Sequence, residues 1–331
     1  MIGLNLGNKM VYWKKCEICN NVIDEFTKNC VCGEKNSLYI TPCDVIGVVG
    51  YGYVGSAVGE TFKDIVSVFG IDEKDKWIEH TKRNFSPPSG NNLLENLVEV
   101  VKDGPIFICV PTPMKPDGTC DISVVESVVK DISKYTEKTA TIVVKSTVVP
   151  GTITKLNQKY KNCKVLYNPE FLTEANYMED FKNQDRIIIG GDPSYSKYLG
   201  NIYKLLFPKT SLYFTDSTTA EMIKYTTNSF LATKVSFFNE INQICEKINV
   251  DYNEVKNMLK LDSRIGTSHM DVPGPDGFLG FGGKCFSKDI NGMIKLAKQK
   301  KVKPEILQAA WNKNLEVRPE KDWEQIDGVL S

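Results

Sequence analysis

The feature that most constrains this chain is an apolar run that ends in a glycine-rich turn. Residues 45–50 read VIGVVG, and Gly50 also begins the segment GYGYVG. A continuous β-branched run is typical of a strand buried on both faces of a sheet. Glycines at Gly50, Gly52 and Gly55 permit a tight turn, a close approach to the backbone and close packing of a following helix. The pattern therefore predicts a strand, a turn and a helix.

This glycine spacing is also that of turns that hold the pyrophosphate of a dinucleotide at a helix N-terminus. Asp72 lies 22 positions after Gly50, at the end of the next expected strand, SVFGID. A carboxylate there accepts a hydrogen bond from a ribose 2′-hydroxyl and repels the 2′-phosphate of NADP. We therefore predict NAD as the cofactor. The alternative is a structural strand-turn-helix without a cofactor.

Further apolar runs predict more strands of the same sheet. They are PIFICV (105–110), TIVVKST (141–147) and RIIIGG (186–191), and helical stretches separate them. Strands that alternate with helices favour a parallel sheet with crossover helices. We predict a Rossmann-type, doubly wound α/β domain over residues 44–218.

The pattern changes after Thr218, where residues 220–248 read as one long helix. Apolar residues at helical spacing predict a single apolar stripe on it; they are Ile223, Phe230, Phe238, Ile241, Cys245 and Ile248. A helix at 250–259, the loop VPGPDGFLGFGG (272–283) and a helix at 288–300 follow. We predict a helical central domain over 219–310 and a charged, weakly patterned tail over 311–331.

Residues 1–43 form an extension without this patterning, and they contain two close cysteine pairs, Cys16 with Cys19 and Cys30 with Cys32. Four thiolates can hold one tetrahedral zinc, and so short a segment buries too little apolar area to fold otherwise. The second pair has one intervening residue where zinc ribbons usually have two. Two interpretations stay open: a structural, ribbon-like zinc site, which we favour, and a tail without metal.

The composition limits the partners of the chain. It has 331 residues, with 41 Lys plus Arg and 41 Asp plus Glu, so its formal net charge is zero. No basic surplus points to nucleic acid or to an anionic membrane surface. Without a recognisable signal peptide or an apolar run of transmembrane length, we expect a cytoplasmic protein. With only two histidines, a His-based catalytic triad is hard to build.

Cys285 stands out among the cysteines because it follows the glycine-rich loop and immediately precedes a helix. The helix dipole there favours the thiolate. Asp289 lies four residues on, on the same helical face, and Lys224 and Asn228 share a face of the long helix in the same way. Taken singly, each residue also has an ordinary structural interpretation.

Several segments together resemble the nucleotide-sugar (UDP-glucose/GDP-mannose) dehydrogenase family. The resemblance covers residues 45–309 and rests on GVVGYGYVG, VPTP, KSTVVPGT, NPEFLTE, AEMIKYTTNSFLATKVSFFNEI, DSRIG and VPGPDGFLGFGGKCFSKD, in the family's order. It implies an NAD-dependent, four-electron oxidation of the primary alcohol of a nucleotide sugar, of the UDP-glucose to UDP-glucuronate type. It also implies a role in polysaccharide biosynthesis.

By this resemblance Cys285 is the nucleophile, which captures an aldehyde as a thiohemiacetal and later carries a thioester. By the same resemblance, Lys224 and Asn228 stabilise the alkoxide. Asp289 holds and activates water together with Thr147, and Glu170 assists proton transfer. Positions that match cofactor contacts are Gly50, Gly52, Tyr53, Val54, Gly55, Asp72, Thr112, Thr147, Glu174 and Lys288. Positions that match substrate contacts are Glu170, Phe171, Leu172, Glu174, Lys224, Asn228, Arg264 and Gly282.

The resemblance also implies partners. Arg264 matches an arginine that reaches substrate across a dimer interface, so we expect a homodimer joined through the long helix. Family members normally continue into a second nucleotide-binding domain that holds the uridine diphosphate, and the residues after 310 are too few for one. We expect the missing contacts to come from an oligomeric partner or a separate chain. Ser287 and Ala175 replace the family's usual proline and glycine, and neither change removes a reacting group.

Two other functions stay open. A β-hydroxyacid-type dehydrogenase has a similar fold and performs a two-electron step with a catalytic lysine, but it does not need Cys285. A non-catalytic NAD-binding or scaffold relative would have no use for the reacting groups, all of which are present. The sequence does not identify the sugar.

Overall fold

The computed structural model describes residues 43–72, 76–80 and 92–325, together with the backbone of five short strands before them. These strands are β1 (Leu4–Asn5), β2 (Met10–Val11), β3 (Trp13–Cys16), β4 (Val22–Asp24) and β5 (Ser37–Tyr39). β1 pairs with β2, and β3 pairs with β4 and β5, all antiparallel. Cys19, Cys30 and Cys32 lie outside the described residues, so the zinc site stays a prediction.

The chain divides into two compact units. The first unit contains residues 1–110, 127–145 and 153–217, and the second contains residues 111–126, 146–152 and 218–331. The second unit thus takes two loops from the sequence of the α/β region and adds them to the helical region.

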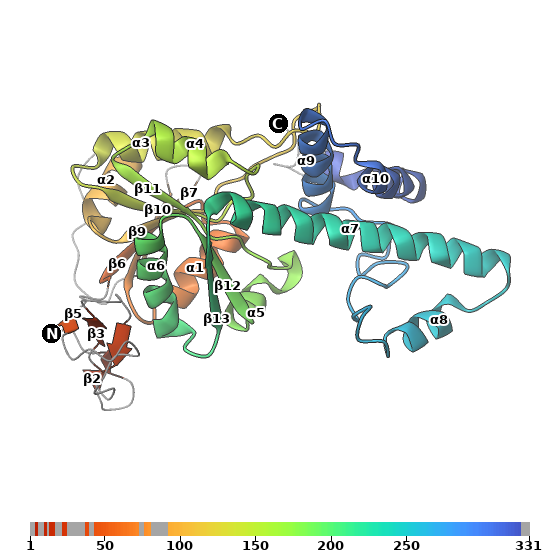
Figure 1. The fold of residues 1–331 in the computed structure, drawn as a ribbon, viewed down its shortest axis with the longest axis horizontal. Coiled ribbons are helices and arrows are strands. Elements are labelled where there is room, and N and C mark those ends of the chain that lie inside the picture. The colour runs from red at the N-terminus through yellow and green to blue at the C-terminus, as the bar shows by residue number, and fades with distance from the viewer. Residues whose placement is uncertain are drawn as a thin grey trace. The chain divides into compact units, whose positions relative to one another are not determined.

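The first unit is built on an eight-stranded sheet (Figure 1). Its strands, in spatial order, are β13 (Ser211–Thr215), β12 (Arg186–Gly190), β11 (Cys163–Tyr167), β10 (Ala140–Val144), β9 (Pro105–Ile108), β6 (Val45–Val49), β7 (Ser67–Asp72) and β8 (Lys76–His80). The five strands from β11 to β7 are parallel. β8 runs antiparallel to β7, and β12 runs antiparallel to β11 while pairing parallel with β13. The prediction of a doubly wound α/β unit is confirmed.

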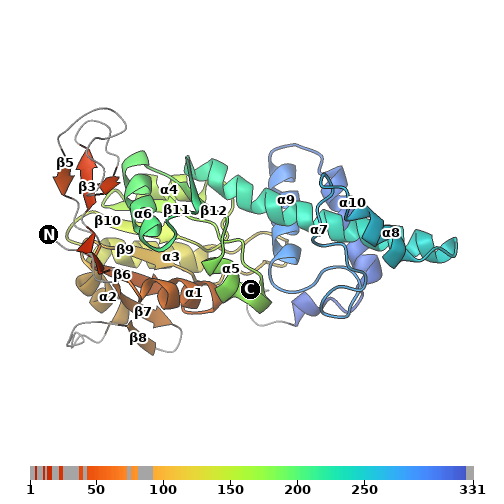
Figure 2. The ribbon, with the colours of Figure 1, turned by 90° about the horizontal axis from the view of Figure 1, so that it is seen from below.

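Helices connect these strands and flank the sheet (Figure 2). They are α1 (Tyr53–Phe62), α2 (Leu93–Val101), α3 (Ser123–Tyr135), α4 (Thr152–Lys159), η1 (Glu174–Asn176), α5 (Tyr177–Lys182) and α6 (Pro193–Leu206). The core lies between sheet and helices, where Ile46, Phe107 and Leu166 are fully buried. Burying each such side chain contributes about 1.5–3 kcal/mol. Because β9 and β10 are buried along their whole length, the alternation typical of half-exposed strands is absent from their sequence.

The second unit is helical. Its helices are α7 (Ser217–Lys247), α8 (Tyr252–Leu259), α9 (Phe286–Gln299), α10 (Glu305–Val317) and η2 (Asp322–Glu324). The sequence pattern predicted α7, α8 and α9 but not α10. Only Ala310 and Asn314 of α10 are buried, but Leu307, Trp311 and Leu315 are half-buried and pack into core clusters. The helix therefore has a short apolar stripe, which the prediction of a weakly patterned tail from residue 311 missed.

The six residues that we predicted to form one apolar stripe along α7 are covered unevenly in the structure. Phe238 and Cys245 are buried and pack with Tyr252 of α8. Phe230 and Ile248, by contrast, are 64% and 61% exposed. The sequence does not say which part of the stripe is covered. Among the described residues, no helix is both long and apolar enough to cross a bilayer.

Candidate active site

The glycine turn of the first unit is shaped by close backbone contacts. Gly50 has a φ of +85°, and a Cβ there would lie 2.8 Å from the carbonyl oxygen of Cys109. A Cβ on Gly55 would overlap the carbonyl oxygen of Gly50. At Gly52, which caps α1, a Cβ would meet no atom of the chain within 4 Å. Two glycines thus serve the fold, and the third leaves open space at a helix N-terminus, which fits an approaching pyrophosphate.

The acidic residue expected beside this turn is held against it. Asp72 ends β7, and its Oδ1 accepts a hydrogen bond from the backbone N–H of Tyr51 at 3.1 Å. The Tyr51 ring itself occupies space left by two glycines, because a Cβ on Gly59 or Gly70 would overlap it. Sequence reasoning missed Tyr51. The sequence signal for its packing was a pair of glycines inside regular elements, Gly59 in α1 and Gly70 in β7.

The NPEFLTE segment also lies in the first unit. Glu170 Oε2 accepts a hydrogen bond from the N–H of Leu172 at 2.8 Å. Glu174 is hydrogen-bonded to the hydroxyl of Tyr53, and this bond raises the pKa of the tyrosine. Tyr53 begins α1 and is 49% exposed. Two residues predicted to contact the cofactor, Tyr53 and Glu174, are therefore brought together.

In the second unit, a buried cysteine joins two predicted cofactor loops. The Cys120 Sγ lies 3.8 Å from the carbonyl oxygen of Thr112 and 3.5 Å from that of Thr147. Glu221 of α7 is fully buried, and its Oε2 accepts a hydrogen bond from the N–H of Gly151 at 2.5 Å. Cys120 and Glu221 thus fix the loops that carry Thr112 and Thr147. Sequence reasoning missed both roles, since neither contact has a local spacing signal.

A buried polar cluster connects α7 to α9. Asp289 is fully buried; its Oδ2 accepts a hydrogen bond from Asn228 Nδ2 at 2.6 Å, and its Oδ1 pairs with the ammonium of Lys288. Lys224, one turn before Asn228 on α7, is only 2% exposed. Spacing placed Asn228 and Asp289 on separate helices, and the structure joins them in one cluster together with Lys288.

The ammonium of Lys288 stays charged in this cluster. Burial opposes its charge, but Asp289, together with Cys120 and Cys285, raises the pKa of Lys288 above its ordinary value. Cys285 is therefore electrostatically coupled to a buried cation, and a cation favours a thiolate over a thiol.

Cys285 differs from the other thiols of the described residues. It is exposed, it caps α9, and its carbonyl oxygen accepts a hydrogen bond from the N–H of Asp289 at 2.9 Å. The remaining free cysteines are buried or half-buried. Burial raises the pKa of Cys43 to about 11 and that of Cys109 to about 12. Exposure, a helix N-terminus and a nearby ammonium together suit Cys285 to act as a nucleophile.

Two predicted substrate residues lie elsewhere in the second unit. Arg264 is 87% exposed, and its guanidinium is bonded to Asp262. Gly282 lies three residues before Cys285, at a point where a Cβ would overlap Arg318 and Asp322. Within the residues that the structure describes, no group of three or more His, Cys, Asp and Glu side chains is placed to hold a metal.

Fold and site together define a class. A parallel sheet with a glycine turn after its first strand and an acidic residue at the end of the second defines the dinucleotide-binding Rossmann proteins. Two models of one family match the sequence. The NAD-binding domain of the UDP-glucose/GDP-mannose dehydrogenase family matches residues 98–207, and the central domain of that family matches residues 218–316. The chain therefore belongs to the UDP-glucose/GDP-mannose dehydrogenase family.

Individual relatives agree with this assignment. The UDP-glucose 6-dehydrogenase of Rickettsia bellii is 41% identical over 219 residues, which are 64% of this chain and 49% of that protein. The enzyme of the same name from Rickettsia prowazekii is 35% identical over 290 residues, 83% of this chain and 64% of that protein. Among solved structures, a UDP-glucose dehydrogenase from Pyrobaculum islandicum is similar with a TM-score of 0.71 and 27% identity, covering 87% of this chain and 72% of that one. This chain spans between half and two thirds of the length of these curated relatives.

Proposed function

We propose that this chain is an NAD-dependent dehydrogenase that oxidises the primary alcohol of a nucleotide sugar to a carboxylate. The observation that carries this proposal is the place of Cys285, an exposed thiol at the start of α9 that is coupled to the buried Lys288–Asp289 pair. A two-electron dehydrogenase needs no such thiol. A four-electron enzyme does, because the aldehyde formed halfway must stay bound.

The first unit fits NAD. Open space at Gly52 and the start of α1 suits a pyrophosphate, and Asp72 at the end of β7 suits a ribose hydroxyl. We assign the remaining cofactor contacts to Gly50, Tyr53, Val54, Gly55, Thr112, Thr147, Glu174 and Lys288. When bound, NAD accepts a hydride from the sugar carbon in each of two successive oxidations.

Cys285 performs the covalent chemistry in this proposal. Its sulfur attacks the aldehyde carbon, and the carbonyl oxygen takes up a proton to give a thiohemiacetal. Loss of a hydride and a proton from that adduct leaves a thioester. Water then attacks the thioester carbon, the C–S bond breaks, and the carboxylate and the free thiol result.

The buried polar groups assist these steps. We assign stabilisation of the developing oxyanion to Lys224 and Asn228. Their burial and the hydrogen bond of the Asn228 amide to Asp289 support this assignment, because such groups need no reorganisation during the reaction. Asp289 with Thr147 holds and activates water, and Glu170 assists proton transfer. Phe171, Leu172, Glu174, Arg264 and Gly282 contact the sugar nucleotide.

The experiment that tests the function is an NADH absorbance assay with UDP-glucose, UDP-N-acetyl sugars and GDP-mannose. The carboxylate product is identified by mass spectrometry. Two NADH per sugar are expected with at least one of them. One NADH per sugar would instead indicate the two-electron β-hydroxyacid-type reaction. Absence of NADH with every sugar would leave a binding or scaffold protein.

We also propose that the protein forms a homodimer through α7. Phe230, Phe237 and Ile244 follow one another at seven-residue intervals and are 64%, 57% and 49% exposed. A line of large apolar side chains on one helix favours a second copy as its cover. In such a dimer Arg264 would reach the partner's substrate. A separate chain that supplies nucleotide contacts is the alternative.

Sedimentation velocity tests the dimer. Phe237→Asp should yield a monomer, whereas the control Ile306→Asp, on α10 where Ile306 is 74% exposed, should leave the dimer intact. A wild-type monomer at micromolar concentration would rule the dimer out and favour the separate chain.

A structural zinc on Cys16, Cys19, Cys30 and Cys32 remains part of the proposal. The strand β3, which ends at Cys16, lies within a three-stranded antiparallel sheet, and zinc ribbons are built on such hairpins. Metal analysis should find one zinc per chain in wild type and none in a Cys19→Ser, Cys30→Ser double variant. Zinc-free wild type purified under reducing conditions would exclude the site.

A further inference from the structure

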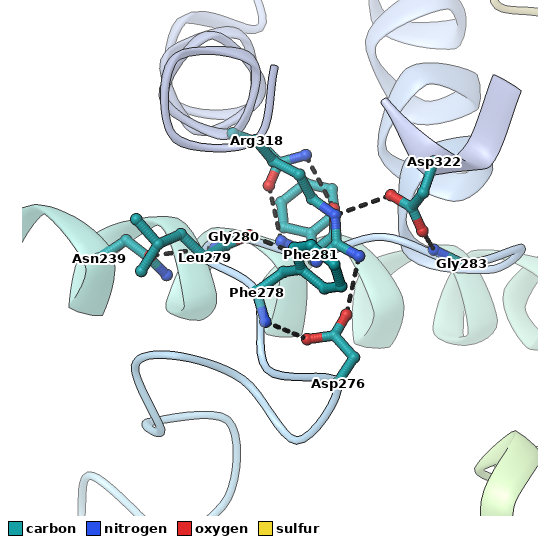
Figure 3. A network of polar contacts seen from close by, with 10 residues as sticks. Asn239, Asp276, Phe278, Leu279, Gly280, Phe281, Gly283, Arg318 and Asp322 are labelled. Carbon is teal, nitrogen blue, oxygen red and sulfur yellow. Dashed lines mark hydrogen bonds and ion pairs between the residues drawn. The ribbon is translucent and has the colours of Figure 1, made fainter. Parts of the chain in front are cut away.

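A buried arginine near the end of the described chain holds the loop that precedes Cys285 (Figure 3). Arg318 is 3% exposed. Its guanidinium pairs with Asp276 Oδ2 at 2.8 Å and with Asp322 Oδ1 at 2.7 Å, and it donates to the carbonyl oxygen of Leu279 at 3.3 Å. The ring of Phe278 lies 5.2 Å from the guanidinium carbon. One side chain thus contacts the first half of the segment 276–283, at Asp276, Phe278 and Leu279.

Two asparagines bind the centre of the same loop. Asn314 of α10 is fully buried; its Oδ1 accepts from the N–H of Phe281 at 2.7 Å, and its Nδ2 donates to the carbonyl oxygen of Phe281 at 3.0 Å. Asn239 of α7 accepts from the N–H of Gly280 at 3.0 Å. Side-chain amides therefore supply the hydrogen bonds that a neighbouring strand would give to these backbone groups.

Asp322 connects this network to the residues next to Cys285. Its Oδ2 accepts from the N–H of Gly283 at 3.2 Å, two residues before the cysteine, while its Oδ1 binds Arg318. Gly282 has no room for a side chain, because a Cβ would overlap both Arg318 and Asp322. The closing contact of the network is thus made immediately before the start of α9.

The contacts of this network depend on one another. A buried guanidinium is costly unless it is paired, and here two carboxylates and a carbonyl oxygen compensate it. Removing either carboxylate leaves a buried charge with less compensation and an unpaired loop N–H. The loop 276–283 has neither helix nor strand of its own, so its shape depends on these side chains.

We propose that Asn314, Arg318 and Asp322 are positioning residues that fix the loop before Cys285 and so set the place of its sulfur. The proposal rests on the function proposed for Cys285. A nucleophile must meet the aldehyde carbon at contact distance, and a displacement of about 1 Å costs roughly 100-fold in rate. The segment after α10 thereby controls the reactivity of a residue more than 30 positions earlier in the chain.

A matched pair of variants tests the proposal. Asp276→Ala and Asp322→Ala each remove one carboxylate from Arg318, and each frees one loop N–H, that of Phe278 or that of Gly283. The two losses differ in place, since Phe278 lies seven residues before Cys285 and Gly283 lies two before it. A role in positioning predicts unequal effects on the cysteine, and a role in stability alone predicts similar ones.

The readout is the rate at which iodoacetamide alkylates Cys285 in the folded full chain, followed by the mass of the peptide that contains it. Asp322→Ala should slow alkylation about tenfold and lower kcat about 10- to 100-fold, with the KM for NAD unchanged. Asp276→Ala should change either rate less than about threefold. Asp322→Asn should recover part of the rate, because its amide oxygen still accepts from Gly283.

Melting temperatures of all variants separate loss of fold from loss of position. If Asp276→Ala and Asp322→Ala slow alkylation equally, or only in proportion to their loss of stability, Asp322 only stabilises the fold and the proposal is wrong. Alkylation needs neither sugar nor NAD. A chain without dehydrogenase activity but with unequal alkylation rates would therefore refute the proposed function and keep the positioning role. A chain with dehydrogenase activity but equal alkylation rates would keep the proposed function and refute the positioning role.

Discussion

Two glycine-rich turns lead into helices in this chain, and they are held in different ways. At the turn of Gly50–Gly55, the N–H of Gly50 donates to Ile71 and that of Tyr51 to Asp72, both at the end of the neighbouring strand. The loop 276–283 before Cys285 has no strand beside it, and side chains from α7, α10 and η2 bind its backbone. The shape of the first turn is therefore fixed by the neighbouring strand of its own sheet. The second depends on residues far along the chain.

The largest expected effect concerns the nucleophile at the end of the second loop. Cys285→Ala should lower carboxylate formation by about 1,000-fold or more, because Cys285 is the group to which we assign covalent capture of the aldehyde. NAD affinity should stay unchanged, since Cys285 is not among the residues that we assign to the cofactor. Product analysis by mass spectrometry and NAD titration by calorimetry measure the two quantities.

The matched control for Cys285 is Cys163→Ala. Burial raises the pKa of Cys163 to about 11, and its thiol in β11 has no assigned chemistry, so this variant should retain wild-type turnover. Undiminished carboxylate output from Cys285→Ala would remove the cysteine from the mechanism.

The first turn offers a pair of substitutions that separates folding from cofactor binding. Gly55→Ala places a Cβ against the carbonyl oxygen of Gly50 and should destabilise the first unit by about 3 kcal/mol or more. Gly52→Ala meets no atom of the chain within 4 Å and should leave stability nearly unchanged. Its methyl group fills the space at the start of α1, so NAD affinity should fall about tenfold or more. Equal NAD affinity in Gly52→Ala and wild type would show that the cofactor does not use this space.

The second loop offers a corresponding pair. Gly277 and Gly280 have φ values of +81° and +69°, so alanine at either position carries a left-handed strain of about 1–2 kcal/mol. A Cβ at Gly277 meets nothing within 4 Å, whereas one at Gly280 would overlap Asn314 Oδ1. Gly280→Ala should therefore destabilise the protein by about 1 kcal/mol more than Gly277→Ala in urea unfolding. Equal losses would mean that Asn314 yields easily and holds the loop weakly.

The same contrast explains what the sequence could predict. The strand β6, its turn, α1 and Asp72 were predictable because their contacts are made between neighbours in a sheet whose strands are apolar runs. The helical position of Cys285 was also predictable, from the glycines before it and the periodic residues after it. The roles assigned to these residues came from the family resemblance, and they remain predictions.

The network around Arg318 was not predictable in this way. The apolar stripe of α10 is short and includes a buried asparagine, and Arg318 and Asp322 look like residues of a charged tail. Their contacts reach Gly283 and Leu279, more than 30 positions away. Long-range side-chain bonds to a loop follow no periodicity. The uneven covering of the α7 stripe was missed for a related reason, because spacing alone does not say which apolar side chains are covered.

The smallest expected effect is on the acid stability of the second loop. Partial burial raises the pKa of Asp322, but Arg318 and the N–H of Gly283 outweigh it, so the pKa lies below the ordinary value. A carboxyl group whose pKa is lowered by folding stabilises the protein above its unfolded pKa, about 3.9. That stabilisation is lost as the pH falls through the folded value.

The measurement is the difference in unfolding free energy between wild type and Asp322→Asn, since Asp262, Asp271 and Glu316 also have lowered pKa values and titrate in the same range. Taking the difference cancels their contribution. It should be largest well above the unfolded pKa of about 3.9 and should disappear once the pH has fallen below the lowered pKa of the folded state, where Asp322 is protonated in both states. Solvent reaches this carboxylate, so the difference should stay below about 1 kcal/mol. A difference that persists unchanged in acid would mean that Asp322 acts through its shape and hydrogen bonds, and that its negative charge is not what holds Arg318 against the loop.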